Sequence, residues 1–373
     1  MLRFQSYLIK PTDIAAPVLW ITAVILIFGV HGCSVVGPSA ISRGRADYNE
    51  AVTRTDDQQI LMALVHHRYL ESIGLMAVSS VTANFSVQAD TGINIGFGPS
   101  DNYAGNLVPL GGGFVYEENP TISYRPVKGA KYIRAMMSPL PLEFLIMFTR
   151  SVTWPEIPYA MLVKSVNDIR NPDFIRSPTI DSGQKFERFI ELMISLRDAG
   201  IAFWGSDPGQ EKGFVLLIRA AASAHRKDVR ELLDLLGLPV PAEAPDQIVI
   251  PVYSALEPGR SGGIAISMRS VFDLMEILSA SIDIPAAHAR SGLVTAYPAV
   301  SLAGRDVRIR TSPTKPGSTA VAVQYRGVWF YIAETDRTTK EAFLLANWLW
   351  SSFIADAAGQ HQAAPVLTVP ASR

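Results

Sequence analysis

Cysteine is almost missing from this chain, since Cys33 is the only one in 373 residues. A lone thiol has no partner within the chain, which excludes an intrachain disulfide framework. The chain also has no excess of charge of one sign, because 33 lysine and arginine residues offset 34 aspartate and glutamate residues. Proteins that bind nucleic acids need surplus basic residues to neutralise phosphates, so we expect no nucleic-acid partner.

Apolar residues, in contrast, are abundant. They make up 48% of the chain, and charged residues make up 18%. Such a composition is typical of a chain that buries a core, and it is not typical of a disordered one. The length allows two or three domains.

The amino terminus has the three parts of an export signal. Arg3 and Lys10 give a positive start, residues 14–30 carry no charge, and Cys33 follows shortly after. The uncharged run is short for a membrane-spanning helix, which needs about 20 apolar residues. The pattern favours a signal peptide over residues 1–32, with a permanent membrane helix as the alternative.

The residues Val30-His31-Gly32-Cys33 resemble the lipobox of bacterial lipoproteins, in which an apolar residue, a small residue and Gly or Ala precede an acylated cysteine. His31 is bulkier and more polar than the residue usual at its place. The resemblance implies that Cys33 is lipidated and becomes the new amino terminus. Several acyl chains anchor a protein stably, because each buried methylene contributes about 0.8 kcal/mol. The alternative is that Cys33 packs as a small hydrophobe.

Ser34 follows the cysteine at the position where lipoproteins retained in the inner membrane often carry aspartate. The resemblance therefore implies a lipid anchor in the outer membrane of a diderm bacterium, with the body on the periplasmic side. An inner-membrane anchor is the alternative.

Composition and pattern divide the chain into five regions. Three prolines fall within residues 239–245 and predict a linker or rigid loop there. We expect a signal peptide at 1–32, a lipidated tether at 33–46, α+β regions at 47–238 and 246–356, and a disordered tail at 357–373.

The apolar spacing predicts both helices and strands. Helices are expected at 47–70, 130–137, 142–150, 184–197, 227–236, 270–280 and 343–354, the last preceded by a capping box of Thr338 and Glu341. Strands are expected at 161–169, 201–204, 214–219, 248–253, 264–268, 320–325 and 328–333. The predicted fold class is α+β, with mostly antiparallel strands, flanking helices, one long amphipathic β-hairpin and an N-terminal signal helix.

The hairpin is predicted from a period of two. Apolar and polar residues alternate over residues 81–97, and a weaker alternation follows between 114 and 124. We expect one long hairpin over about 81–124, with its apolar face covering the domain core. The alternative is that each subunit contributes two strands to a multi-subunit membrane barrel, since a crossing strand needs only about 9 to 11 residues.

Three further segments are similar to an uncharacterised family of proteobacterial lipoproteins. They are Arg45-Ala46-Asp47-Tyr48-Asn49, the stretch 120–126 (PTISYRP) and the stretch 325–332 (YRGVWFYI). The likeness spans most of the chain. It implies a cell-envelope protein and supplies no catalytic residue.

One motif suggests catalysis. Gly259-Arg260-Ser261-Gly262-Gly263 resembles the nucleophile loop of chymotrypsin-like proteases, in which backbone N–H groups converge on an oxyanion. Those enzymes also need an upstream histidine, and His225 lies too close in the chain for their two barrels. The glycines and Pro258 favour a simple turn, so Ser261 is a weak catalytic candidate.

Histidines give no metal-site pattern. His66 and His67 are adjacent, so on a helix their rings diverge by about 100° and cannot chelate one ion. His67 follows the apolar row of its helix and is expected to pack. His225 and His288 have no neighbouring ligands in the sequence.

Two other ligand patterns are incomplete. Asp168, Asn171 and Asp173 lack the central glycine and terminal glutamate of a calcium loop. Gly96-Phe97-Gly98 lacks the third glycine of a dinucleotide motif. We expect no metal and no cofactor.

Aromatic residues gather near the carboxyl terminus, where they either fill the core or line a ligand cleft. We expect them mainly in the core, because each ring buries a large area. They are Trp329, Phe330, Tyr331, Phe343, Trp348 and Trp350.

These patterns predict a lipid-anchored, non-enzymatic scaffold or assembly component of the cell envelope. Its partners would be the membrane and either another envelope protein or further copies of itself. Two alternatives stay open: an oligomeric outer-membrane pore or secretion component that inserts the 81–124 hairpin, and an envelope serine hydrolase that uses Ser261.

Overall fold

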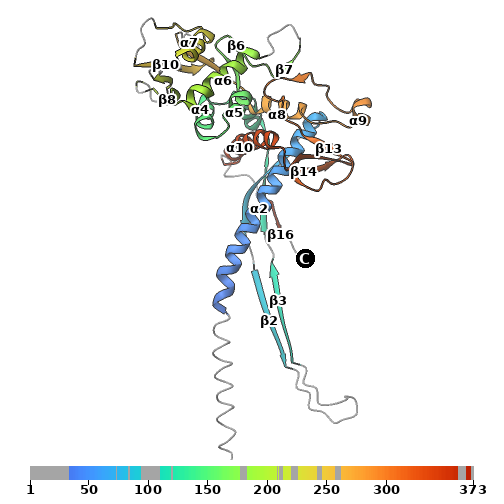
Figure 1. Cartoon of the computed structure of the whole chain (residues 1–373). Helices are drawn as coiled ribbons and strands as arrows, with labels where there is room; N and C mark the ends of the chain where they lie inside the picture. The colour runs from blue at the N-terminus through green and yellow to red at the C-terminus, as the bar shows by residue number, and fades with distance from the viewer. Residues whose placement is uncertain are drawn as a thin grey trace, which may run out of the picture. The chain divides into compact units, whose positions relative to one another are not determined.

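The α+β class is confirmed, since antiparallel-rich sheets are flanked by helices (Figure 1). The chain forms two compact units, residues 1–56 and residues 57–373, the latter called the second unit below. The predicted signal peptide, residues 1–32, lies outside the described residues. This computed structural model describes residues 33–72, 74–82, 85–93, 110–118, 121–176, 183–207, 209, 213–219, 226–241, 246–256, 262–359 and 367–370.

Helix α2 (Cys33–Arg68) is longer than the predicted helix 47–70. The region 33–46, expected as a tether, is helical. Gly37 and Pro38 misled the prediction, because both residue types usually interrupt or end helices, whereas here they lie within α2. Over the described part of the chain, no helix has the length and apolar character needed to cross a membrane.

The other helices lie in the second unit, and most match the predicted spans. Ser270 caps α8 as expected: its hydroxyl accepts a hydrogen bond from the Asp273 N–H at 3.1 Å, and the Asp273 carboxylate accepts one from the Ser270 N–H at 2.8 Å. The helices are α3 (Ala130–Met137), α4 (Leu142–Ser151), α5 (Glu156–Leu162), α6 (Gln184–Asp198), α7 (Arg226–Leu235), α8 (Val271–Ala280), α9 (Ala286–Arg290) and α10 (Arg337–Gly359).

The start of α10 differs from the prediction. The helix begins at Arg337 and not near Phe343, and the predicted capping pair is wrong. Asp336 caps the helix instead, because its carboxylate accepts a hydrogen bond from the Thr339 N–H at 3.1 Å.

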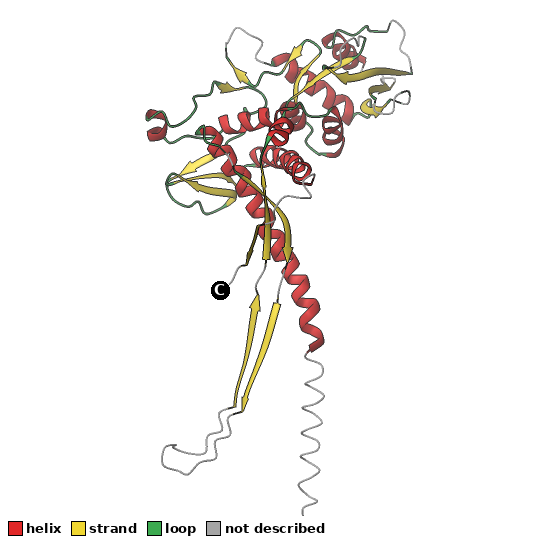
Figure 2. Cartoon of the chain, turned by 180° about the vertical axis from the view of Figure 1, so that it is seen from behind, coloured by secondary structure: helices red, strands yellow, loops and turns green. Residues whose placement is uncertain are grey.

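The predicted hairpin exists and is longer than expected. It consists of β1 (Leu75–Thr82), β2 (Phe85–Ile93), β3 (Leu110–Glu118) and β4 (Thr121–Val127). β1 pairs with β4 and β2 with β3, both antiparallel, in one continuing register from Thr82↔Thr121 to Phe85↔Glu118. Figure 2 shows β2 and β3 side by side. The β1–β4 half joins the core through Leu75 and Val127.

The carboxyl-terminal tail also differs from expectation. Residues 357–359 continue α10, and β16 (Leu367–Pro370) pairs with the free edge of β4. Valine and threonine at 367–370 favour this strand pairing, which a composition rich in small residues concealed.

A six-stranded sheet crosses the predicted boundary at 239–245. Its order is β6-β5-β11-β10-β9-β8, and only the β10–β11 pair within it is parallel. The proline-containing segment therefore leads from α7 into β10, which belongs to the same sheet as β9 before α7, and it does not separate two domains. The strands are β5 (Val163–Val166), β6 (Ile169–Arg170), β8 (Ala202–Ser206), β9 (Phe214–Arg219), β10 (Gln247–Ser254) and β11 (Ile264–Met268).

Two smaller sheets complete the second unit. β7 (Phe174–Ile175) pairs with β12 (Ala299–Val300), and β15 (Val328–Ala333) lies between β13 (Arg310–Ser312) and β14 (Thr319–Tyr325). The predicted turn between β14 and β15 is confirmed: Arg326 and Gly327 both have positive φ, as a two-residue hairpin turn of this hand requires.

One buried cation links several of these elements. Arg269 follows β11 and its side chain is fully buried, at 0% exposure. Its Nε donates to the Asp173 carboxylate at 2.6 Å. Its Nη atoms donate to the carbonyl oxygens of Ala160, Val163 and Asn171 at 2.8, 2.6 and 2.7 Å. The end of α5, the start of β5 and the loop after β6 are thus held by one guanidinium.

Replacing Arg269 by methionine should lower the free energy of unfolding by about 3–5 kcal/mol, because the carbonyl groups and Asp173 lose their partner without access to water. Urea denaturation of the detergent-solubilised chain measures this. Arg188→Met is the control: it removes an arginine whose ion pairs are exposed, and such pairs contribute little. Equal losses for both variants would contradict the role of Arg269.

Candidate functional site

One hollow of the second unit lies among three helices. We call it the large groove. It has a volume of about 580 Å³, within the usual range of ligand sites. Its walls come from Trp154, α5, α6, residues 302–307 and α10.

The floor of the large groove is apolar. Ile190 and Ile194 are one turn apart on α6, and Ile157 faces them from α5. Leu302 and Val307 close the floor from the loop that precedes β13. This surface would bind aliphatic groups through the hydrophobic effect.

The rim of the large groove is acidic. Arg305 donates to Glu187 at 2.7 Å, and this hydrogen bond lowers the pKa of Glu187 below its ordinary value, so the carboxylate stays charged at neutral pH. Arginines pair with four of the acids that line the groove, and among the described residues Glu156 is the acid left to attract a cationic ligand. One arginine, Arg305, and five acids line the groove: Glu156, Glu187, Glu191, Asp306 and Glu341.

Trp154 and Arg337 stand at the edge where the large groove meets a second hollow. The Arg337 guanidinium lies 4.0 Å from the centre of the Trp154 ring, a cation–π contact. Its Nε donates to Glu341 one turn further along α10, at 2.7 Å. Glu341 lines both hollows, so the Arg337–Glu341 pair lies on the ridge between them.

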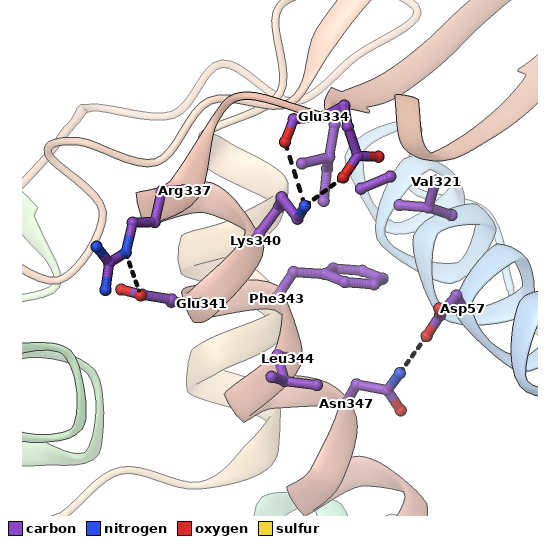
Figure 3. A pocket seen from close by; sticks show the side chains of 11 residues that line it. Asp57, Val321, Glu334, Arg337, Lys340, Glu341, Phe343, Leu344 and Asn347 are labelled. Atoms are coloured by element: carbon purple, nitrogen blue, oxygen red, sulfur yellow. Dashed lines mark hydrogen bonds and ion pairs between the residues drawn. The ribbon is translucent and has the colours of Figure 1, made fainter. Parts of the chain in front are cut away.

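The second hollow, the Phe343 pocket, has a volume of about 390 Å³. Figure 3 shows the Phe343 ring between two polar pairs. On one side Lys340 donates to the Glu334 carboxylate at 2.5 Å, and on the other Asn347 donates to Asp57. The pocket therefore has an apolar floor and a rim whose charges are already paired.

Exposed apolar side chains continue from these hollows along α10. Leu344 and Trp348 are 44% and 50% exposed, on the same helical face as Arg337 and Glu341. The Trp348 ring stacks on Phe148 of α4, with centroids 6.0 Å apart. Exposed tryptophan and leucine beside a groove are typical of protein-binding surfaces.

The predicted aromatic cluster does not form one cleft. Phe330, Phe343 and Trp350 are buried, as expected for core residues, whereas Trp348 is half exposed. Trp329 lies beneath the Lys315 ammonium at 5.7 Å on the small sheet.

Cys33 and Ser261 are the two predicted covalent sites. Cys33 is the first residue of α2, and Ser261 lies outside the described residues, as does His225. Gly263, two residues after Ser261, has a packing reason to be glycine: a Cβ there would lie 2.5 Å from the Pro251 carbonyl oxygen. A close approach between β10 and β11 therefore accounts for this glycine without catalysis.

The histidines have separate environments. His67 packs against the edge of the Phe272 ring at 5.4 Å, as predicted. His66 lies 3.5 Å from Glu71, and His288 Nδ1 shares a 2.7 Å hydrogen bond with the Tyr69 hydroxyl. Across the described ranges, no group of three or more histidine, cysteine or acidic residues has metal-binding geometry.

A polar cluster surrounds Glu71, which follows α2. Tyr325 donates to one carboxylate oxygen at 2.5 Å and Arg326 to the other at 2.7 Å. These hydrogen bonds, that of Tyr325 foremost, lower the pKa of Glu71. Tyr325 ends β14 and Arg326 lies in the turn before β15. The cluster therefore fastens that turn to the end of α2.

Two residues of the incomplete calcium pattern, Asn171 and Asp173, have a structural role. Asp173 binds Arg269, and Asn171 donates to the carbonyl oxygens of Ala160 and Val163 at 2.8 and 2.7 Å. The side chains of Asn171 and Asp173 therefore bind backbone carbonyl groups and the Arg269 guanidinium.

The site residues that sequence reasoning missed are Trp154, Arg337 and the groove-lining acids. They come from four segments far apart in the chain, so no local spacing could reveal them. Comparison with family models, curated proteins and solved structures finds no significant match.

Burial lowers the pKa of His67 below its ordinary value. The unfolded chain therefore takes up a proton below about pH 6.5 that the folded state resists, and the free energy of unfolding should fall as the pH drops through that range. His67→Gln should flatten this decline between about pH 6.5 and 5, as measured by urea denaturation at each pH. An identical slope in both proteins would contradict the assignment.

Proposed function

We propose that this chain is a non-enzymatic assembly component of the cell envelope, anchored by lipid at Cys33 in the outer membrane, whose periplasmic body binds a basic amphipathic segment of a partner protein in the large groove. The acidic rim over an apolar floor is the observation that carries the proposal. The partner is an envelope protein or another copy of the chain.

The chemistry of the groove favours binding over catalysis. The described residues that line it include the hydroxyl groups of Ser195 and Thr338 but no histidine, lysine or cysteine. Glu187 and Glu341 are held in ion pairs with arginines. General acid–base catalysis needs a base poised near the operating pH, whereas carboxylates around an apolar floor suit the recognition of cations.

The shape of the groove favours a helical ligand. An amphipathic helix lays its apolar face into a groove between helices and presents residues one turn apart. Ile157, Ile190 and Ile194 would meet that face, and lysine or arginine flanking it would meet Glu156. Trp154 and Trp348, both about half exposed, would extend the contact beyond the groove.

The anchor is tested by replacing its sulfur. Cys33→Ser should release the protein from the membrane fraction or leave a slower-migrating precursor, because no acyl chain can then be attached. Ser34→Ala is the neighbouring control and should stay in the membrane fraction. Mass spectrometry of the wild type should find an acylated residue 33 at the new amino terminus; an intact Met1 with an unmodified thiol would contradict the anchor.

The groove is tested by charge reversal. Full-length protein in detergent should bind a fluorescent lysine–leucine helical peptide, and an acidic peptide of the same pattern should bind poorly. Glu156→Lys should weaken binding of the basic peptide by about threefold to tenfold, because it reverses an unpaired rim charge. Fluorescence anisotropy measures both peptides.

The matched control is Glu143→Lys. Glu143 and Glu156 both lie exposed in the first turn of a helix, so both reversals disturb the helix dipole alike. Only Glu156 lines the large groove. Equal weakening by both variants, or equal binding of both peptides, would contradict the proposed function.

A further inference from the structure

The outer half of the long hairpin forms a sheet of its own. β2 and β3 pair with each other and, among the described strands, with no other. Within the described ranges, each strand therefore has one edge whose backbone N–H and C=O groups lack a strand partner. Such edges readily pair with strands of another chain, and an isolated two-stranded sheet is marginally stable in water.

The register gives this sheet two different faces. Residues directly opposite in an antiparallel pair lie on the same face. One face carries the pairs Val87↔Tyr116, Ala89↔Phe114 and Ile93↔Leu110, with Thr91↔Gly112 among them and Phe85↔Glu118 at its end. The other face carries the pairs Ser86↔Glu117, Gln88↔Val115, Asp90↔Gly113 and Gly92↔Gly111. The first face is mostly apolar, and the second is mostly polar or glycine.

The length of the strands suits a bilayer. β2 and β3 have nine residues each, which corresponds to about 30 Å at about 3.3 Å per residue. Tilted by about 40°, as barrel strands are, they span about 23 Å, close to the roughly 25 Å apolar band of outer-membrane barrels. Glu117 and Glu118, which pair with Ser86 and Phe85, lie at one end of this span, where headgroups and water would begin.

We propose that β2–β3 hairpins of several copies of this chain pair edge to edge and close into a membrane-inserted barrel, with the apolar face toward lipid and the polar face toward a water-filled lumen. Closure pairs every backbone group, which the hydrocarbon core demands. Eight or nine hairpins would give about 16–18 strands, the number at which barrels leave an aqueous channel. The large groove takes no part, so this inference goes beyond the proposed function.

The test uses full-length protein in detergent and in liposomes loaded with a fluorescent dye. The wild type should form rings of uniform mass by mass photometry and should release the dye. Ala89→Arg should lose dye release at least tenfold, because it sets a cation on the lipid-facing side. Gln88→Arg, its neighbour on the opposite face, should keep the rings and the release and shift ion selectivity toward anions in planar-bilayer recordings.

Both variants should bind the basic peptide and stay in the membrane fraction as the wild type does, which separates a failure of the barrel from a failure of the groove or the anchor. The same readouts, with circular dichroism, show whether each variant has folded. A wild type that is strictly monomeric or releases no dye would overturn the inference. Equal loss of release by Ala89→Arg and Gln88→Arg would overturn the assignment of faces.

Discussion

The buried guanidinium of Arg269 is the interaction on which much of the second unit depends. A charge at 0% exposure is tolerated only when each of its donors has an acceptor. Here the acceptors include the carbonyl oxygens of Ala160 and Met161, at 2.8 and 3.1 Å. Both residues also line the large groove. The hydrogen bonds that satisfy the charge therefore also set the position of the groove wall formed by α5.

Local pattern predicted the elements well and the site poorly. Alternation over residues 81–97 gave the hairpin, and Ser270 gave the start of α8, because both signals come from neighbouring residues. Arg269 was not recognised, since a buried arginine and an exposed one look alike in sequence. The prolines at 239–245 suggested a domain boundary, but strand pairing between distant segments, which spacing cannot show, joins both sides in one sheet.

Sequence patterns also failed to predict the large groove, because its residues come from distant segments. Over the whole chain, acidic and basic residues almost cancel, so the net charge gives no indication of a cationic ligand. Folding concentrates five acids around one apolar floor while several arginines point to individual carboxylates at its edge. A charge balance taken over the chain is therefore a poor guide to the field at one site, because an ion pair neutralises only its immediate surroundings.

Anchor and hairpin reinforce each other in the proposed assembly. Copies tethered to one membrane meet at a much higher effective concentration than copies in solution, so weak edge contacts between hairpins become sufficient for closure. A hairpin that stays monomeric would expose edges prone to aggregation. Lipid attachment at Cys33 would thus bring the hairpin edges together at the bilayer, where closure into a barrel pairs the outer backbone groups of β2 and β3.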